Sequence, residues 1–258
     1  MPLADRPRPD GPARLVAHRG ASRAAPENTL PAFDAAARTG ARWVEFDVSL
    51  LGDGTPVLCH DATLDRCTDA TGPLSAIGRA DLAGIDAGAW FGPAFAGTRM
   101  PTLDAALDHL GAAGLSGNLE MKPQDADPGP LAAAVAQALA ARPWTRTRLT
   151  VSSFEAGALD AFRTLDRETP VALLYGHPPE DWPERAEALA AEGMHVVRPA
   201  LDADLRAAAL AEGVALRVYT VNDLAELRDQ RGPGLDAVIT DDPALFLTDA
   251  DWAAWAAA

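Results

Sequence analysis

The sequence has few cysteines and no long apolar run. Its 258 residues include two cysteines, Cys59 and Cys67, which lie close together in the chain. Small secreted domains held by disulfides carry several cysteine pairs, so this sequence excludes a disulfide scaffold. No run of about 18 or more apolar residues occurs, and the segment from Met1 to Arg14 lacks the apolar core of a signal peptide. We therefore expect a cytoplasmic protein with no membrane span.

Positive charge is also scarce. The chain has 22 Lys and Arg residues against 37 Asp and Glu residues, which gives a formal net charge of -15. Such a negative field repels polyanions, so binding of nucleic acid through a broad basic surface is excluded. A phosphate-bearing small molecule would need a strong local positive charge, and a bound cation is a natural source of it.

Length and composition favour one large folded domain. Hydrophobic residues make up 48% of the chain and charged residues 23%, which is typical of a globular protein and argues against disorder. Single α/β barrels typically run to about 250 residues. We therefore expect residues 1–258 to form a single domain.

Short apolar segments rich in β-formers alternate with alanine-rich stretches of helical periodicity. The helical stretches include Leu131 to Ala141, Glu184 to Ala191, Leu205 to Ala211 and Leu224 to Gln230, and Asp251 to Ala258 resembles a terminal helix. The eight candidate strands are Leu15 to His18, Trp43 to Leu50, Gly117 to Met121, Leu149 to Ser153, Val171 to Tyr175, Met194 to Arg198, Leu216 to Val221 and Ala237 to Thr240. This alternation predicts an α/β fold with a parallel sheet, and eight units favour a closed (β/α)8 TIM barrel over an open doubly wound sheet.

A ninth extended segment, Pro56 to His60, follows the turn-forming pair Asp53 and Gly54. A two-residue hairpin turn there would fold this segment back, antiparallel to the second strand, and would pair Asp47 with His60. Residues from about 61 to 100 are spotted with Gly, Pro and Asp and contain no clear strand-helix unit. We expect them to form a small loop-rich insertion after the second strand, near the barrel mouth.

Three acidic residues stand on predicted strands. Glu45 and Asp47 are two positions apart, so they share one face of the second strand, and Glu120 lies near the end of the next barrel strand. Three carboxylates at the mouth of a barrel would form an oxygen site suited to Mg²⁺, Ca²⁺ or Mn²⁺. The alternative for any single acid is that it faces solvent or pairs with a lysine.

Two histidines are expected beside these acids. His18 and Arg19 follow the first strand, and His60 lies at the end of the hairpin. Two histidines that flank a phosphate can serve as general base and general acid, while Arg19 and Lys122 can hold its non-bridging oxygens. The sequence leaves open which histidine has which role.

Other polar residues of these segments have structural interpretations. Asn28 or Thr29 can cap a helix that Gly40 ends. We interpret the remaining histidines as packing residues; they are His109, His177 and His195.

Together these motifs resemble the glycerophosphodiester phosphodiesterase family, in particular its cytosolic bacterial members. The motifs are His18-Arg19-Gly20, Pro26-Glu27-Asn28-Thr29, Glu45-Phe46-Asp47, His60-Asp61 with Leu64-Asp65-Arg66, Glu120-Met121-Lys122, Ser152-Ser153-Phe154, Tyr219-Thr220-Val221-Asn222 and Ile239-Thr240-Asp241. The resemblance implies a barrel with a small insertion. It matches Glu45, Asp47 and Glu120 with the family's metal ligands, His18 and His60 with its acid-base pair, and Arg19 and Lys122 with its phosphate contacts.

The resemblance also implies an activity. A member would use one divalent metal ion, Mg²⁺ or Ca²⁺ before Mn²⁺, to hydrolyse small glycerophosphodiesters such as glycerophosphocholine or glycerophosphoethanolamine. The products would be glycerol 3-phosphate and an alcohol, formed through a cyclic phosphate. Tyr219 stands where many members carry tryptophan, which leaves the alcohol open. Candidates to line the pocket, or merely to pack at its rim, are Phe154, Tyr219 and Trp90. The oligomeric state is left open.

Two alternatives remain at this point. One is a phospholipase-like phosphodiesterase or lyase on the same barrel, although the acidic charge and the lack of an amphipathic segment disfavour an anionic membrane surface. The other is a catalytically inactive barrel that serves as a binding module. The presence of all seven matched site residues argues against it.

Overall fold

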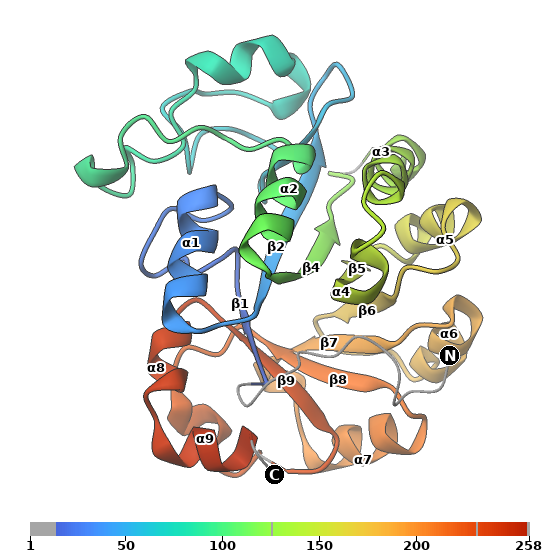
Figure 1. Ribbon diagram of the computed structural model, residues 1–258. Coiled ribbons are helices and arrows are strands. Elements are labelled where there is room, and N and C mark those ends of the chain that lie inside the picture. The colour runs from blue at the N-terminus through green and yellow to red at the C-terminus, as the bar shows by residue number, and fades with distance from the viewer. Residues whose placement is uncertain (1–13, 125, 231, 257–258) are drawn as a thin grey trace.

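The computed structural model describes residues 14–124, 126–230 and 232–256. The predicted lack of a signal peptide and the last two residues of the predicted terminal helix therefore concern parts outside the described ranges. Within them, eight parallel strands alternate with helices (Figure 1). The strands are β1 (Leu15–Ala17), β2 (Trp43–Leu50), β4 (Ser116–Met121), β5 (Leu149–Ser153), β6 (Val171–Tyr175), β7 (Gly193–Val197), β8 (Ala215–Tyr219) and β9 (Leu235–Thr240).

The sheet closes on itself. Neighbouring strands follow the order β1-β9-β8-β7-β6-β5-β4-β2, and β1 also pairs with β2, with Val16 opposite Trp43. All of these pairings are parallel. The predicted (β/α)8 barrel is thus confirmed, and the carboxyl ends of all its strands open at one mouth.

Helices surround the barrel. They are α1 (Leu30–Thr39), α2 (Leu103–Ala113), α3 (Pro128–Ala140), α4 (Thr145–Arg148), α5 (Ala156–Leu165), α6 (Trp182–Leu189), α7 (Ala203–Ala211), α8 (Pro243–Leu247) and α9 (Ala250–Ala256). The predicted helix at Leu224 to Gln230 is instead a single 3-10 turn, Leu224–Leu227, because so short a connection between β8 and β9 holds only i to i+3 hydrogen bonds. None of the helices in the described ranges is long and apolar enough to cross a membrane. The cytoplasmic location stays a prediction.

Alternation along β2 explains where the core and the site lie. Val44, Phe46 and Val48 face the helices and join the large buried cluster with Phe33 of α1. The residues between them, Trp43, Glu45 and Asp47, face the barrel interior and are buried there. Burial of apolar side chains outside the barrel therefore directs carboxylates inside it.

The hairpin differs from its prediction by one residue. β3 (Pro56–Leu58) runs antiparallel to β2 as expected, but Ser49 pairs with Val57, so Cys59 and not His60 lies opposite Asp47. The reason is the turn. The Leu51 N–H donates to the Thr55 carbonyl at 3.0 Å, which makes a three-residue loop that ends at Gly54 with a φ of 81°. A positive φ at the last position is typical of three-residue hairpin loops.

Residues 61–100 form the predicted insertion, which Figure 1 shows beside the carboxyl end of β2. It consists of loops and three short 3-10 turns, at Leu74–Ala76, Arg79–Gly84 and Pro93–Phe95. Its Leu64 and Met100 belong to a small apolar cluster that also includes Val57 of β3. This packing gives the loop-rich segment a defined shape at the mouth.

Candidate active site

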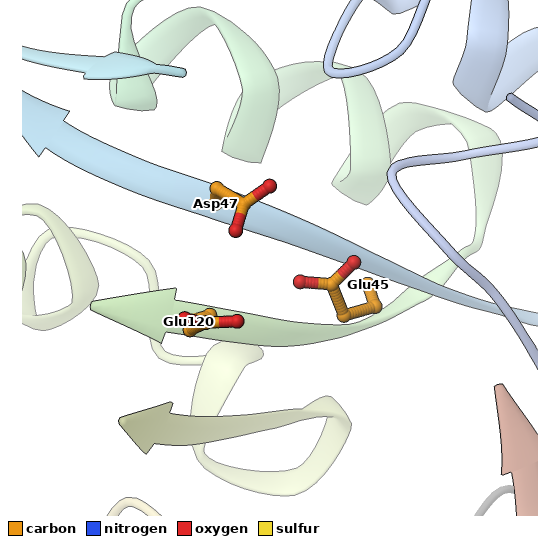
Figure 2. Close-up of side chains that lie close together, drawn as sticks. All are labelled: Glu45, Asp47 and Glu120. Carbon is orange, nitrogen blue, oxygen red and sulfur yellow. The ribbon is translucent and has the colours of Figure 1, made fainter. Parts of the chain in front are cut away.

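Three acids meet inside the barrel near the mouth. Asp47 of β2 and Glu120 of β4 are opposite each other in the parallel register, and Glu45 is two residues before Asp47 on the same face. Each offers one carboxylate oxygen within 4.8 Å of the others. Figure 2 shows the three carboxyl groups turned toward a common space between the two strands.

This acidic group has the electrostatics of a cation site. All three side chains are buried, and one Glu45 oxygen, Oε1, has no hydrogen-bond partner in the described structure. Burial, and then the charges of Asp47 and Glu120, raise the pKa of Glu45. Burial and the charge of Asp47 raise the pKa of Glu120 to about 7. Buried carboxylates that raise one another's pKa are stabilised by a bound divalent ion, so these residues fit a metal of the hard, oxygen-binding type.

Arg19 and Asn28 hold the acids in place. The Arg19 backbone N–H donates to Glu45 Oε2 at 3.0 Å, and its guanidinium Nε lies 3.2 Å from Asp47 Oδ2. The Asn28 amide donates to Asp47 Oδ2 at 2.8 Å and accepts from the Asp47 N–H at 3.1 Å. Of the two predicted cap residues, Asn28 or Thr29, Asn28 does not have this role. Thr29 occupies the N-cap position of α1, but its hydroxyl donates to the Pro26 carbonyl.

Lys122 lies just beyond the end of β4, on the face of Glu120. Its ammonium group is 2.8 Å from Glu120 Oε1 and 3.8 Å from Asp47 Oδ1. Two cationic side chains, Arg19 and Lys122, thus flank three carboxylates. An anionic ligand that approaches the acidic group meets both positive groups beside it.

His18 and His60 line one cavity with Glu45, Glu120 and Arg19; its volume is about 150 Å³. The structure therefore brings the two predicted histidines together, although His60 is not paired with Asp47 in the hairpin as predicted. His18 Nε2 is 3.8 Å from Glu45 Oε2.

Each of these histidines has an aspartate on Nδ1. His18 Nδ1 lies 2.6 Å from Asp241, and His60 Nδ1 lies 2.6 Å from Asp61. A carboxylate accepts from an N–H, so Nδ1 carries the proton of each neutral ring and leaves Nε2 free. Burial lowers the pKa of His60, against the raising effect of nearby carboxylates.

Further charged and polar side chains support the aspartates. Ser22 and Asn222 donate to Asp241, at 3.0 and 2.6 Å. Arg66 of the insertion donates to Asp61 and, with two nitrogens, to Glu27, which also accepts from Arg19. Sequence reasoning assigned no role to this outer set. Asp61 and Asp241 stand inside the motifs named above, and their position next to a histidine or at a strand end is the only signal that could have pointed to them.

Aromatic side chains edge the cavity. Phe154 and Tyr219 line it and pack edge to face, with centroids 6.0 Å apart. Phe154 remains 48% exposed, so its ring is available to a ligand at the rim. Trp90 instead packs against Phe91 within the insertion and is not among the residues that line this cavity.

The remaining histidines differ from one another. His109 pairs with Asp34 near the surface at 2.8 Å, and His177 is exposed. His195 is fully buried inside the barrel beside Arg217 and lines the same cavity as His18.

Comparison with known proteins agrees with this arrangement. Residues 18–245 match the model of the glycerophosphoryl diester phosphodiesterase family. A glycerophosphodiester phosphodiesterase of Caldanaerobacter subterraneus is 31% identical over 230 residues, which cover 89% of this chain and 94% of that protein.

Solved structures are similar as well. An Oleispira antarctica phosphodiesterase in complex with the product sn-glycerol-3-phosphate superposes with a TM-score of 0.84 at 35% identity, covering 90% of this chain and 94% of the other. A glycerophosphodiester phosphodiesterase from Agrobacterium tumefaciens gives 0.77 at 29% identity and covers 92% and 100% of the two chains. The chain belongs to the glycerophosphoryl diester phosphodiesterase family and is a glycerophosphodiester phosphodiesterase.

Proposed function

We propose that this enzyme hydrolyses water-soluble glycerophosphodiesters, such as glycerophosphocholine and glycerophosphoethanolamine, to glycerol 3-phosphate and the free alcohol, with His18 and His60 as its acid-base pair. The observation that carries the proposal is the shared cavity. Two histidines with free Nε2 atoms line a space of about 150 Å³ together with Glu45, Glu120 and Arg19, and Asp47 and Lys122 lie next to these acids. Cleavage of a phosphodiester is accelerated by a general base, a general acid and positive charge at the non-bridging oxygens.

The first step uses a hydroxyl of the substrate itself. The glycerol C2 oxygen forms a bond to phosphorus while the bond from phosphorus to the alcohol oxygen breaks. One histidine takes the proton of the C2 hydroxyl, and the other gives a proton to the departing alcohol. Aspartates on Nδ1 hold both rings so that Nε2 faces the reacting atoms. Each general acid or base typically accelerates a reaction by about 10²- to 10⁴-fold.

The second step opens the cyclic phosphate. A water oxygen adds to phosphorus, the bond to the C2 oxygen breaks, and the two histidines return their protons in reverse. Throughout, Arg19 and Lys122 bind the non-bridging oxygens, where negative charge develops. Glu45, Asp47 and Glu120 would hold one divalent ion, Mg²⁺ or Ca²⁺ before Mn²⁺, which supplies Lewis-acid polarisation of substrate oxygens.

The test is release of glycerol 3-phosphate from both diesters, measured by a coupled assay with EDTA and with each of the three metals. We expect release that EDTA abolishes and a metal restores. His18→Ala and His60→Ala should lower kcat by roughly 10²-fold or more, whereas His109→Ala, a surface control, should match the wild type. Activity on phospholipid vesicles but not on the soluble diesters would favour the phospholipase-like alternative. No release by folded protein with any metal would favour a binding module.

A further inference from the structure

The floor of the cavity carries two polar groups that the proposed chemistry does not use. Asn118 of β4, which is opposite Glu45 in the strand register, and His195 of β7 both line it, and both are buried, at 2% and 0% exposure. Asn118 Oδ1 and His195 Nδ1 have no hydrogen-bond partner in the described structure. Buried polar atoms are nearly always paired, so two unpaired ones at one floor indicate a ligand.

A neighbouring arginine decides which hydrogen-bonding role His195 has. Arg217 Nη1 lies 3.1 Å from His195 Nε2, and a guanidinium only donates, so Nε2 accepts. Burial and the charge of Arg217 lower the pKa of His195, which keeps the ring neutral. The proton of the neutral ring therefore resides on Nδ1, and this N–H is a donor presented to the cavity.

Arg217 is itself fixed in place. It is 1% exposed and pairs with Glu192 at 3.0 Å and with Asp236 at 3.3 Å. Thr150 donates to Glu192, which completes a buried polar network beneath the floor. The network orients His195 through Arg217.

The floor thus offers one unpaired donor and one unpaired acceptor, both buried, with apolar walls made by Leu174 and Ile239. A hydroxyl group both donates and accepts, so it has the complementary group for each of the two unpaired atoms. The cavity is far larger than the roughly 10–15 Å³ that one water needs, so it has room for a ligand arm.

We infer that Asn118 and His195 form a subsite for the terminal C1 hydroxyl of the glycerol moiety, the hydroxyl that neither attacks phosphorus nor is esterified to it. This inference rests on the proposed function and deepens it. The subsite selects substrates whose glycerol is free of acyl chains, because an ester at C1 has no hydrogen to donate and no room in a closed floor. It is a specificity determinant and takes no part in bond making.

The experiment compares two substrates that differ only at this hydroxyl. Glycerophosphocholine has it; the matching phosphocholine ester of propane-1,2-diol keeps the attacking C2 hydroxyl and replaces the C1 hydroxymethyl with methyl. For wild-type enzyme we expect kcat/KM to fall on the order of 10- to 100-fold with the deoxy substrate, since a buried donor and acceptor lose their partner.

Three substitutions of His195 then test whether the substrate preference depends on its Nδ1–H. His195→Asn keeps a donor near the Nδ1 position, His195→Gln keeps an acceptor near the Nε2 position that Arg217 uses, and His195→Leu keeps neither. We expect Asn to retain most of the substrate preference and Gln and Leu to lose it. Asn118→Leu should lose it too. Each variant is read as a ratio of two substrates, so a general loss of activity cancels, and His109→Gln serves as the matched control.

Every result decides the inference. Equal kcat/KM values for the two substrates in the wild type would overturn this inference but not the proposed function, and would mean that the floor holds only water. A preference that survives in the folded Gln, Leu and Asn118→Leu variants overturns it as well. Failure of the proposed function is a different result, in which wild-type enzyme cleaves neither diester. If the His195 variants do not fold, the wild-type comparison and Asn118→Leu remain as tests.

Discussion

Each catalytic histidine of the proposal depends on a carboxylate that fixes its tautomer. Asp241 accepts from His18 Nδ1 and is itself bound by Ser22 and Asn222, so it is held from three sides. Burial opposes its ionisation, but the hydrogen bonds from His18, Asn222 and Ser22 prevail and lower the pKa of Asp241 to about 2. It is therefore a full anion at neutral pH, and the His18 ring presents Nε2 to the cavity.

Asp241→Asn should keep the side-chain geometry beside His18 but change the tautomer of the His18 ring. The amide has the same shape but can donate to Nδ1, which moves the ring proton to Nε2 and removes the free base. We expect kcat to fall by roughly 10²- to 10⁴-fold with little change in the melting temperature. Asp34→Asn, the same change beside surface His109, is the control. Wild-type kcat in Asp241→Asn would rule out this role for Asp241.

At the scale of elements, one side chain of the insertion connects it to the carboxylates beside the catalytic histidines. Arg66 bridges Asp61, which holds His60, and Glu27, which accepts from Arg19 of the loop after β1. The insertion thereby contacts groups around both histidines. The rest of it packs on an apolar cluster shared with the β2-β3 hairpin, so Arg66 is a positioning residue supplied from outside the barrel.

Arg66→Met should lower kcat roughly tenfold or more, because Asp61 and Glu27, the carboxylates that orient His60 and Arg19, lose the side chain that holds them. Arg79→Met, an exposed arginine of the same insertion, should leave kcat unchanged. An equal effect of the two substitutions would point to a general requirement for the insertion and not to this bridge.

The same bridge predicts a pH dependence of stability. Hydrogen bonds from Arg66 lower the pKa of Asp61 to about 2, below its unfolded value of about 3.9. A depressed pKa in the folded state contributes stability that is present above the unfolded pKa and lost as pH falls through the folded pKa. The difference in melting temperature between wild type and Arg66→Met should therefore shrink as the pH falls from about 5 to about 2. A difference independent of pH would contradict the pairing.

For the whole molecule, the buried acidic group makes the metal a stabilising ligand. We propose that the 258 residues act as a single domain, since the barrel is continuous and the insertion packs at its mouth. An ion bound only by the folded state stabilises it by RT ln(1 + [L]/Kd), about 2.7 kcal/mol at a hundredfold excess over Kd.

Thermal unfolding should accordingly be one transition whose midpoint rises with added Mg²⁺, Ca²⁺ or Mn²⁺ and returns with EDTA. Glu45→Gln and Glu120→Gln should abolish the rise, and Glu184→Gln, an exposed acid on α6, should keep it. A melting curve that no metal shifts would remove the metal from this site. Two transitions would refute the single domain.

The sequence by itself determined the alternation of strands and helices and the identity of the acids. Alternation along Trp43 to Leu50 places Glu45 and Asp47 on one face whatever the rest of the chain does, because side-chain direction in a strand is a local property. Eight strand-helix units likewise required a parallel sheet. The hairpin register was mispredicted, since a three-residue loop and a two-residue loop differ only in backbone angles at Gly52 to Gly54.

Tertiary structure alone decided what surrounds those acids. His18 and Asp241 are 223 residues apart in the chain and meet because β1 pairs with β9 when the barrel closes. Asn28, which resembled a helix cap, is turned to Asp47 by the loop after β1. His195, which resembled a packing residue, faces the cavity because β7 directs it inward and Arg217 takes its other nitrogen. Periodicity assigns a residue to a face, but only closure of the sheet decides which faces meet.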